Sequence, residues 1–298
     1  MSAASLGERP YGNPASGAMK KLVVTADDFG AAQEVNDAVL DAHANGILTA
    51  ASLMVAASAA ADAVARAQAT PTLRVGLHLV LVEGKPVLPA AQVPDLIDAG
   101  GHFRTDMARA GAAMFFLPHV KKQLAAEIAA QFAAFRATGL PLDHVNAHKH
   151  FHLHPTIAGL MLSIGREFGL KAARVPLEPA GTLSRVEPYK GSAVAAITRP
   201  FAQGLRRRFA RAGIASPDQV FGLAWSGAMT AARLRGIIAH LPEGLSEIYL
   251  HPATGDYPGS APGYAYAAER AALLDPAVVA AARCGDIRLG GFCDFPVH

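Results

Sequence analysis

Cysteine and long apolar runs are both scarce in this 298-residue sequence. Cys284 and Cys293 form no Cys-x-x-Cys motif, so the sequence predicts neither a disulfide framework nor a thiolate metal site, and a reducing compartment is the simplest expectation. No apolar run approaches the roughly twenty residues that a membrane-spanning helix needs. Residues 1–19 are rich in Ser, Ala, Gly and Pro and lack the apolar centre of a secretory signal, so we expect a disordered tail and a cytoplasmic protein.

Charge is sparse as well. Charged residues make up 17% of the chain, and 27 Lys and Arg against 24 Asp and Glu leave a formal net charge of +3. This composition excludes a disordered or coiled-coil protein, and the net charge is too small to predict a nucleic acid partner. Hydrophobic residues make up 51%, which is enough for a large core. We therefore expect one globular domain over residues 20–298.

Short apolar runs alternate with helix-like segments along the chain, and such runs are typical of buried parallel strands. The predicted strands lie at residues 21–26, 50–55, 73–82, 144–154, 172–176, 220–225, 246–251 and 287–292. About seven or eight strands alternating with helices predict an α/β fold, namely a distorted (β/α) TIM-like barrel in a single domain. An open doubly wound sheet is the alternative. No Gly-x-Gly-x-x-Gly follows the first strand, which argues against a dinucleotide-binding version of that sheet.

Histidine is concentrated at residues 144–155, where it occupies five of the twelve positions. Because alternate side chains of a strand share a face, an extended run would place all five on one side: His144, His148, His150, His152 and His154. Neutral imidazoles are good ligands for a borderline metal such as zinc. The run therefore predicts a metal site, with a histidine-rich surface loop as the alternative.

Other polar residues fall where predicted strands end. Asp27 and Asp28 follow the first strand, His78 lies near the end of the third, and His251 ends a later one. Catalytic groups of parallel barrels come from the carboxyl ends of several strands, so we expect these residues to meet near His148. Adjacent carboxylates repel each other, and a cation relieves that repulsion. Each residue alone also fits a plainer role, as a helix cap, a core histidine or a turn histidine.

Four motifs, in this order, resemble the YdjC-like carbohydrate deacetylase family, which includes chitooligosaccharide deacetylases and a branch associated with hopanoid biosynthesis. They are Thr-Ala-Asp-Asp-Phe-Gly at 25–30, Gly-Leu-His-Leu at 76–79, His-x-His-x-His at 148–152 and Leu-His-Pro at 250–252. The likeness extends over residues 20–294. The aspartate block and the histidine run are fairly specific in combination, whereas either alone is weak.

The resemblance implies a distorted (β/α) barrel that binds one divalent metal. It implies metal ligands at Asp28, His78 and His148, a general base at Asp27 and a general acid at His251. One Asp and two His leave coordination positions open for water and a substrate carbonyl. Zinc suits this donor set best, and magnesium, manganese, nickel and cobalt are the alternatives. The implied reaction is hydrolysis of an acetamide, in which the acid protonates the leaving amine.

Two positions depart from the family pattern. Asn146 stands where members often have Asp, and Lys149 stands where they often have His. Neither change removes an implied ligand, but both alter the surroundings of the metal. Arg174 follows another predicted strand, and we expect it to orient the base or to bind substrate hydroxyls, unless it is a surface arginine. We expect His150 and His152 to contact the substrate or to support the metal ligands.

Two further segments bear on the substrate. Residues 95–120 are rich in Met and Phe and predict a lid over an apolar group, and the Arg-rich stretch at 201–211 predicts contact with an anionic membrane. A solvated helix packed on the barrel is the alternative for that stretch. We expect an N-acetylglucosaminyl hopanoid as substrate, deacetylated by an enzyme that is peripheral at the inner face of the membrane. The alternatives are a soluble chitooligosaccharide deacetylase, a glycoside hydrolase using Asp27 or Asp28, and a non-enzymatic metal-binding protein.

Overall fold

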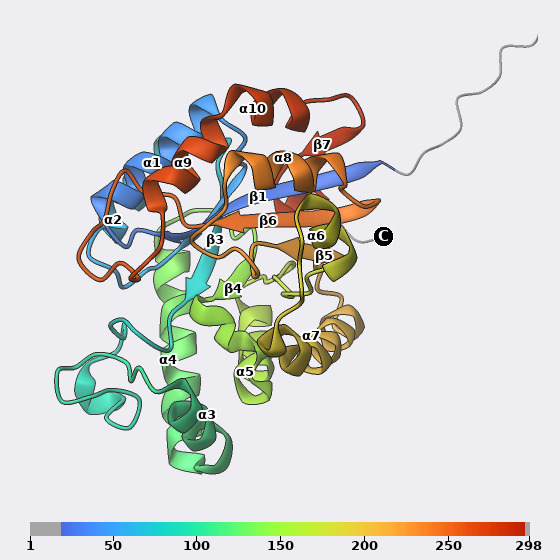
Figure 1. The fold of residues 1–298 in the computed structure, drawn as a ribbon. Helices are drawn as coiled ribbons and strands as arrows, with labels where there is room; N and C mark the ends of the chain where they lie inside the picture. Colours follow the sequence, from blue (N-terminus) through green and yellow to red (C-terminus); the bar gives the residue numbers. More distant parts are fainter. Residues whose placement is uncertain (1–18, 296–298) are drawn as a thin grey trace, which may run out of the picture.

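The structure of the protein is a computed structural model, which describes residues 19–295. Within these residues, seven parallel strands form one curled sheet, and helices pack on its outer face (Figure 1). The strands are β1 (Lys20–Phe29), β2 (Ala50–Leu53), β3 (Arg74–Leu79), β4 (Val145–Ala147), β5 (Gln219–Phe221), β6 (Gly244–Leu250) and β7 (Ile287–Leu289). The predicted tail at residues 1–19 lies, apart from Met19, outside the described residues.

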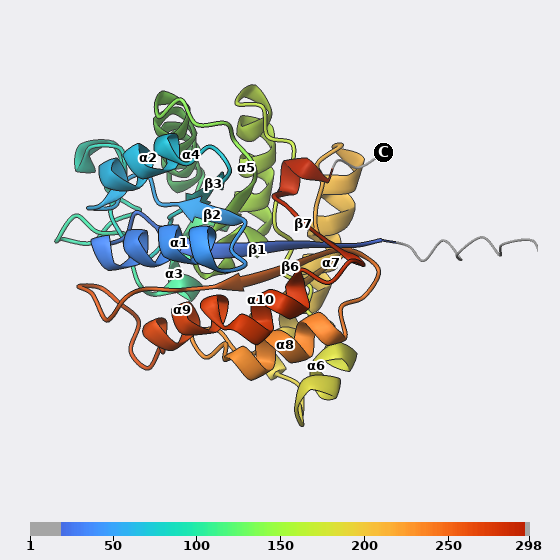
Figure 2. The ribbon, with the colours of Figure 1, turned by 90° about the horizontal axis from the view of Figure 1, so that it is seen from above.

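The helices separate these strands along the chain, as the alternating sequence pattern predicts. They are α1 (Gln33–Asn45), α2 (Ala60–Ala69), α3 (Met107–Phe116), α4 (Pro118–Ala137), α5 (Pro155–Glu167), α6 (Ala180–Val186), α7 (Ala193–Arg211), α8 (Ala231–Ala239), α9 (Tyr266–Leu274) and α10 (Pro276–Ala282). Seen from above, they surround the curled sheet with β1 near its middle (Figure 2). Short 3-10 segments are η1 (Ala90–Gln92), η2 (His148–Leu153) and η3 (Phe292–Asp294).

The sheet is a distorted barrel rather than an open sheet. Its strand order is β4-β3-β2-β1-β6-β5, and β7 pairs with the start of β1. Between the outer strands β4 and β5, an irregular segment spans the gap. Ala173 bridges to Val145, and the Val220 amide donates to the Leu177 carbonyl at 2.9 Å. The predicted strand at 172–176 is thus reduced to isolated bridges, and the predicted distorted barrel is confirmed.

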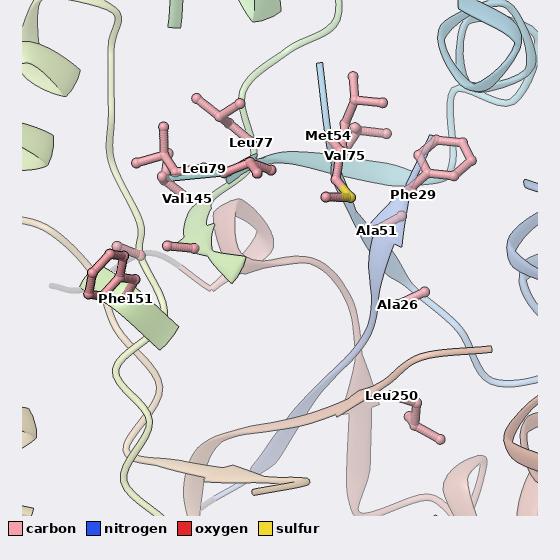
Figure 3. Packing of buried hydrophobic residues seen from close by; sticks show 14 of the residues in the cluster. Ala26, Phe29, Ala51, Met54, Val75, Leu77, Leu79, Val145, Phe151 and Leu250 are labelled. Carbon is pink, nitrogen blue, oxygen red and sulfur yellow. The ribbon is translucent and has the colours of Figure 1, made fainter. Parts of the chain in front are cut away.

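Strand alternation separates the two faces of the sheet. On β3, Leu77 and Leu79 point toward the helices and pack with Val145, as Figure 3 shows. The residue between them, His78, faces the barrel interior together with Gly76, where an added Cβ would lie 2.5 Å from the His144 ring. The helix-facing residues therefore build the main core, and the inward positions are left for other chemistry.

The barrel interior is layered along β1. Val23 belongs to an apolar cluster at the lower end, which includes Leu245 of β6 and Phe292 of the C-terminal segment. Two residues further along, Thr25 is buried and hydrogen-bonded to Glu247 at 2.8 Å. The next inward residue of β1 is Asp27, which lies at the carboxyl end of the strand, where the candidate site begins. Apolar packing thus closes the bottom of the barrel, and polar side chains line the top.

The histidine run does not continue as a strand. β4 ends at Ala147, which pairs with Leu79, the last residue of β3. Because the neighbouring strand ends at the same level, pairing stops, and the chain turns into η2 with positive φ angles of 55° at Lys149 and 52° at His150. The expectation that five histidines share one strand face is therefore wrong.

The two segments expected to bear on the substrate are largely helical. Residues 95–120 contain α3 and the start of α4, and the Arg-rich stretch at 201–211 lies in α7. Of the helices in the described part of the chain, none is both long enough and apolar enough to span a bilayer.

Candidate metal centre and active site

The predicted site residues at the strand ends meet at one cavity of about 800 Å³. Asp27 and Asp28 come from β1, His78 from β3, His148 from the residue after β4, and His251 from the residue after β6. Parallel strands bring their carboxyl ends to the same edge, so side chains far apart in the chain converge there. The cavity is within the size range of small-molecule sites.

A β-bulge on β1 presents both aspartates to the cavity. Ala26 pairs with Ala51 and Phe29 with Leu53, so Asp27 and Asp28 stand together opposite a single residue of β2. Successive strand residues normally point to opposite faces. Asp28 escapes this alternation because its φ angle is +62°, a left-handed conformation that aspartate tolerates better than most residues.

Asp28, His78 and His148 form a compact set of possible metal ligands. Asp28 Oδ1 lies 3.2 Å from His78 Nε2 and 3.1 Å from His148 Nδ1, and the two nitrogens are 3.4 Å apart. A tetrahedron with metal bonds of about 2.0–2.1 Å has edges of about 3.3–3.4 Å, so the spacing suits three ligands of one cation. One carboxylate oxygen and two imidazole nitrogens are also a donor set that zinc accepts.

The charge balance of this cluster favours a cation. Burial acts to raise the pKa of Asp28, but His148 and His78 outweigh it and hold that pKa well below its usual value. Asp28 therefore remains a carboxylate, and positive charge beside it is favourable. The residues present thus fit a divalent metal in both spacing and charge.

Asn146 sets which nitrogen of His78 is free. Its Nδ2 donates to Asp27 Oδ1 at 2.9 Å, since an ionised carboxylate can only accept. Its Oδ1 consequently faces His78 Nδ1 at 2.7 Å and accepts a hydrogen bond from the Nδ1–H. In the neutral ring, His78 Nε2 is then the unprotonated nitrogen and is directed at Asp28, which is the form that a metal ligand requires.

The same orientation is supported from below by a buried chain of hydrogen bonds. Asn146 Nδ2 also donates to Ser52 Oγ at 2.9 Å, and Ser52 Oγ lies 2.9 Å from His144 Nε2. His144 Nδ1 lies 2.9 Å from Asp143, whose carboxylate also accepts the backbone amides of Phe292 and Cys293. His144 therefore belongs to the support of the site and not to the candidate ligands.

Asp27 is held by a buried arginine. Arg174 is fully buried and donates from Nη1 to Asp27 Oδ2 at 2.5 Å and from Nη2 to Asp27 Oδ1 at 3.0 Å. Burial opposes ionisation of Asp27, but Arg174 and His78 outweigh it and lower its pKa. Arg174 also binds Glu247, at 2.7 Å from Nη2, so one guanidinium serves two buried carboxylates. Arg174 does not line the cavity, and its contacts orient Asp27.

Removing Arg174 is expected to destabilise the fold. Arg174→Ala leaves Asp27 and Glu247 as uncompensated buried carboxylates, which should lower the free energy of unfolding by about 3–5 kcal/mol. Urea denaturation of the variant beside Arg235→Ala, which removes an exposed arginine from α8, measures the difference. Equal unfolding midpoints for the two variants would contradict this assignment.

The remaining histidines of the run lie in different surroundings. His150 lines the cavity, and its Nε2 lies 2.9 Å from the Tyr249 hydroxyl. His152 is fully buried away from the cavity, with Nε2 at 3.0 Å from the Arg174 carbonyl. Burial and Arg174 lower the pKa of His152 to about 3, so it stays neutral. His154 lies against Phe115, outside the cavity.

His251 lines the cavity directly after β6, which lies on the other side of β1 from β3 and β4 in the sheet. Its backbone amide donates to Glu269 at 2.6 Å, which anchors the turn after β6. Its ring contacts those of Tyr249 and Tyr264, with centroids 5.7 and 5.2 Å away. Within the described residues, its Nδ1 has no hydrogen-bond partner. Aromatic side chains beside a polar centre are suited to the apolar face of a sugar ring.

Several residues of the site were not predicted. Glu247 interrupts an otherwise apolar strand, and a charge in such a position is a usable signal, because charges are rarely buried without a partner. Ser52 and the tyrosines of the cavity wall carry no comparable signal. No residue of 95–120 lines the cavity, so the predicted lid over the substrate is wrong. Residues of α7 and of the loop before α9 line the cavity instead, including Ser192, Thr198 and Tyr257.

The fold and this site define an α/β half-barrel protein with a candidate metal centre at the carboxyl ends of its strands. Residues 21–283 match the model of the family described as YdjC-like protein, and the chain belongs to that family. A relative named carbohydrate deacetylase in Geobacillus stearothermophilus is 30% identical, over 87% of this chain and 91% of its own length.

Two other relatives carry the same name. The human protein is 31% identical over 80% of this chain and 76% of its own length. The Brevibacillus brevis protein is 40% identical, but the match spans only 53% of this chain and 58% of that relative. Among solved structures, a provisionally named cellobiose-phosphate cleavage protein of Enterococcus faecalis V583 superposes with a TM-score of 0.73, over 94% of this chain and 100% of its own. At 23% identity, that likeness shows the shared fold.

Proposed function

We propose that this protein is a metal-dependent carbohydrate N-deacetylase. The observation that carries the proposal is the convergence of Asp28, His78 and His148 beside the separate carboxylate of Asp27. Such a pairing supplies a metal site and a base next to one another, and together these two can hydrolyse an unactivated amide. Three related proteins named carbohydrate deacetylase support the same reaction.

Each residue of the site has a distinct role in this proposal. Asp28, His78 and His148 would hold the metal, and zinc suits their donor set better than magnesium does. When bound, the cation supplies Lewis acidity that polarises the acetyl carbonyl and makes water a better nucleophile. Asp27, kept ionised and oriented by Arg174, accepts the proton of the attacking water. His251 protonates the amine as it leaves, because an amide anion is too basic to depart unaided.

The proposed substrate is an N-acetylglucosamine-type sugar attached to a lipid, specifically an N-acetylglucosaminyl hopanoid converted to the glucosaminyl form. A cavity of about 800 Å³ has room beyond one sugar, and its wall continues along the first turns of α7 through Ser192, Ala195 and Thr198. A soluble chitooligosaccharide would fill the same space as further sugar rings and is the second candidate.

The substrate is tested directly by mass spectrometry. Metal-loaded protein incubated with the glycolipid is expected to remove one acetyl group, and a chelator added beforehand should abolish the change. Turnover of N-acetylated chitooligosaccharides with no turnover of the glycolipid would assign a soluble substrate. Activity that survives complete metal removal would contradict the metal-dependent mechanism, and release of free sugar without loss of acetyl would assign a glycoside hydrolase.

A further inference from the structure

Large apolar side chains are exposed at two neighbouring places on the surface. Of the six large hydrophobic residues that are exposed among residues 19–295, five lie at the end of α3 or on α7. We call these five the apolar rim: Phe115, Phe116, Leu117, Ile197 and Phe201. Phe116 is 73% exposed and Ile197 69%, so their side chains contribute little to the core. Clustered exposure of this kind marks an interaction surface, whereas single exposed residues do not.

The two parts of the apolar rim are connected. The Phe115 ring lies 6.0 Å from that of His154, which precedes α5. The next residue, Pro155, lines a groove of about 390 Å³ together with Phe201 and Leu205 of α7. Ile197 and Phe201 are four residues apart and therefore share one edge of the helix. The rim thus runs from the end of α3, across the start of α5, to α7. These three helices are neighbours in Figure 1.

The helices that carry the rim, or that follow it directly, are rich in positive charge. α7 carries five arginines and no acidic residue: Arg199, Arg206, Arg207, Arg208 and Arg211. None of the five forms a salt bridge with another residue of 19–295. Lys121 and Lys122 follow Leu117 by about one helical turn at the start of α4. Aromatic and aliphatic side chains flanked by arginine and lysine are the features that bind helices to the interface of an anionic bilayer.

We infer that the apolar rim and the arginines of α7 dock this protein on an anionic membrane surface. Charge complementarity selects the membrane over a neutral partner, since α7 and the start of α4 carry seven cations and no carboxylate belongs to α3 or α7. The first turns of α7 line the catalytic cavity, so docking there places the cavity mouth next to the lipid headgroups. In its link to catalysis the inference rests on the proposed lipid-linked substrate, but binding to a membrane is measured without any substrate.

The test is sedimentation of the full chain with vesicles of phosphatidylcholine, with and without phosphatidylglycerol. We expect binding to the anionic vesicles only, and binding that weakens as salt is added. Phe116→Ala/Phe201→Ala should weaken it by at least about tenfold, because exposed rings lose their burial in the bilayer. The matched control is Met19→Ala, since Met19 is the sixth exposed large hydrophobic residue among residues 19–295 and lies just before β1, away from α3 and α7.

A second pair of variants isolates the charge. Arg207→Ala/Arg211→Ala should weaken binding about 30-fold, from about 1 kcal/mol for each arginine near an anionic surface. Arg235→Ala/Arg288→Ala removes the same charge from α8 and β7 and should leave binding unchanged. Equal binding by all variants, or no binding by the unaltered chain, overturns the inference. So does a dimer that the Phe116 and Phe201 substitutions abolish, because the rim would then serve a second copy.

Failure of this inference is distinct from failure of the proposed function. Turnover of a water-soluble N-acetylated chitooligosaccharide, measured without vesicles, should be the same in the rim variants and the unaltered chain. Vesicle binding without deacetylation would leave the membrane surface standing and refute the enzyme. Deacetylation without vesicle binding would refute the membrane surface and leave the proposed enzyme standing.

Discussion

His78→Ala is expected to abolish both metal retention and deacetylation. His78 Nε2 lies within 3.4 Å of both other candidate ligand atoms, so its loss removes one of three ligands and the ring that closes the site. Loss of an outer hydrogen-bond partner alone typically costs 10–100-fold in metal affinity, so we expect the loss of a ligand to exceed about 100-fold. Titration with zinc and measurement of bound metal after dialysis will give the affinity.

The control for this variant is His119→Ala, which removes an exposed imidazole from the start of α4. Its metal content and its turnover should match those of the unaltered chain. If His78→Ala keeps the metal at full affinity, the cation is held elsewhere, and the histidine run acts as a binding site on its own. A result of that kind would favour a metal-carrier protein over an enzyme.

Asp27→Asn is expected to lower kcat by about 10²–10⁴-fold while the bound metal is retained, since a positioned base typically contributes that much. Asparagine has nearly the same shape, but its amide cannot accept the proton of the attacking water. Asp27 is not among the three candidate ligands, so metal affinity should change far less than turnover. Steady-state kinetics combined with metal analysis separates these two effects.

The matched control is Asp37→Asn, which makes the same chemical change at a partly exposed carboxylate of α1. A decrease in kcat of less than about tenfold in Asp27→Asn would show that another group takes the proton. Loss of the metal in that variant would instead make Asp27 a ligand.

The lowered pKa of Asp27 also predicts how stability depends on pH. Its folded-state pKa lies below the unfolded value near 3.9, so the unfolded chain binds the proton more readily. Stability from the Asp27–Arg174 pair is therefore fully present above about pH 5 and is lost as pH falls through the unfolded value toward the folded one.

Much of the fold could be predicted because the hydrophobic periodicity of helices and strands is a local property of the sequence. Strands β1, β3 and β6 lie where charge-poor apolar runs indicated buried strands. The hydrophobic pattern gave a wrong prediction where pairing with a neighbouring strand decides how far a strand extends. Residues 148–154 carry the alternation of a strand, but β4 ends at Ala147 because β3 ends beside it.

The candidate ligands were accessible to sequence reasoning because Asp28 and His78 stand at or near the ends of predicted strands and His148 lies in the histidine run. Their partners were harder to find. Glu247 and Ser52 occupy inward positions of β6 and β2, and only the curvature of the sheet brings them to Arg174 and Asn146. The apolar rim was equally hidden, since exposure of Phe116 depends on how α3 packs and not on the sequence around it.

The sequence by itself determined the α/β alternation, the residues that end the strands and the kinds of ligand available, because these follow from local hydrophobic pattern and side-chain chemistry. The tertiary structure decided which of those residues meet. The bulge turns Asp28 toward His78 and His148, and Asn146, held by an ionised Asp27, leaves His78 Nε2 free to bind. Hydrogen-bond direction depends on neighbours from five different strands and segments, and no local pattern encodes it.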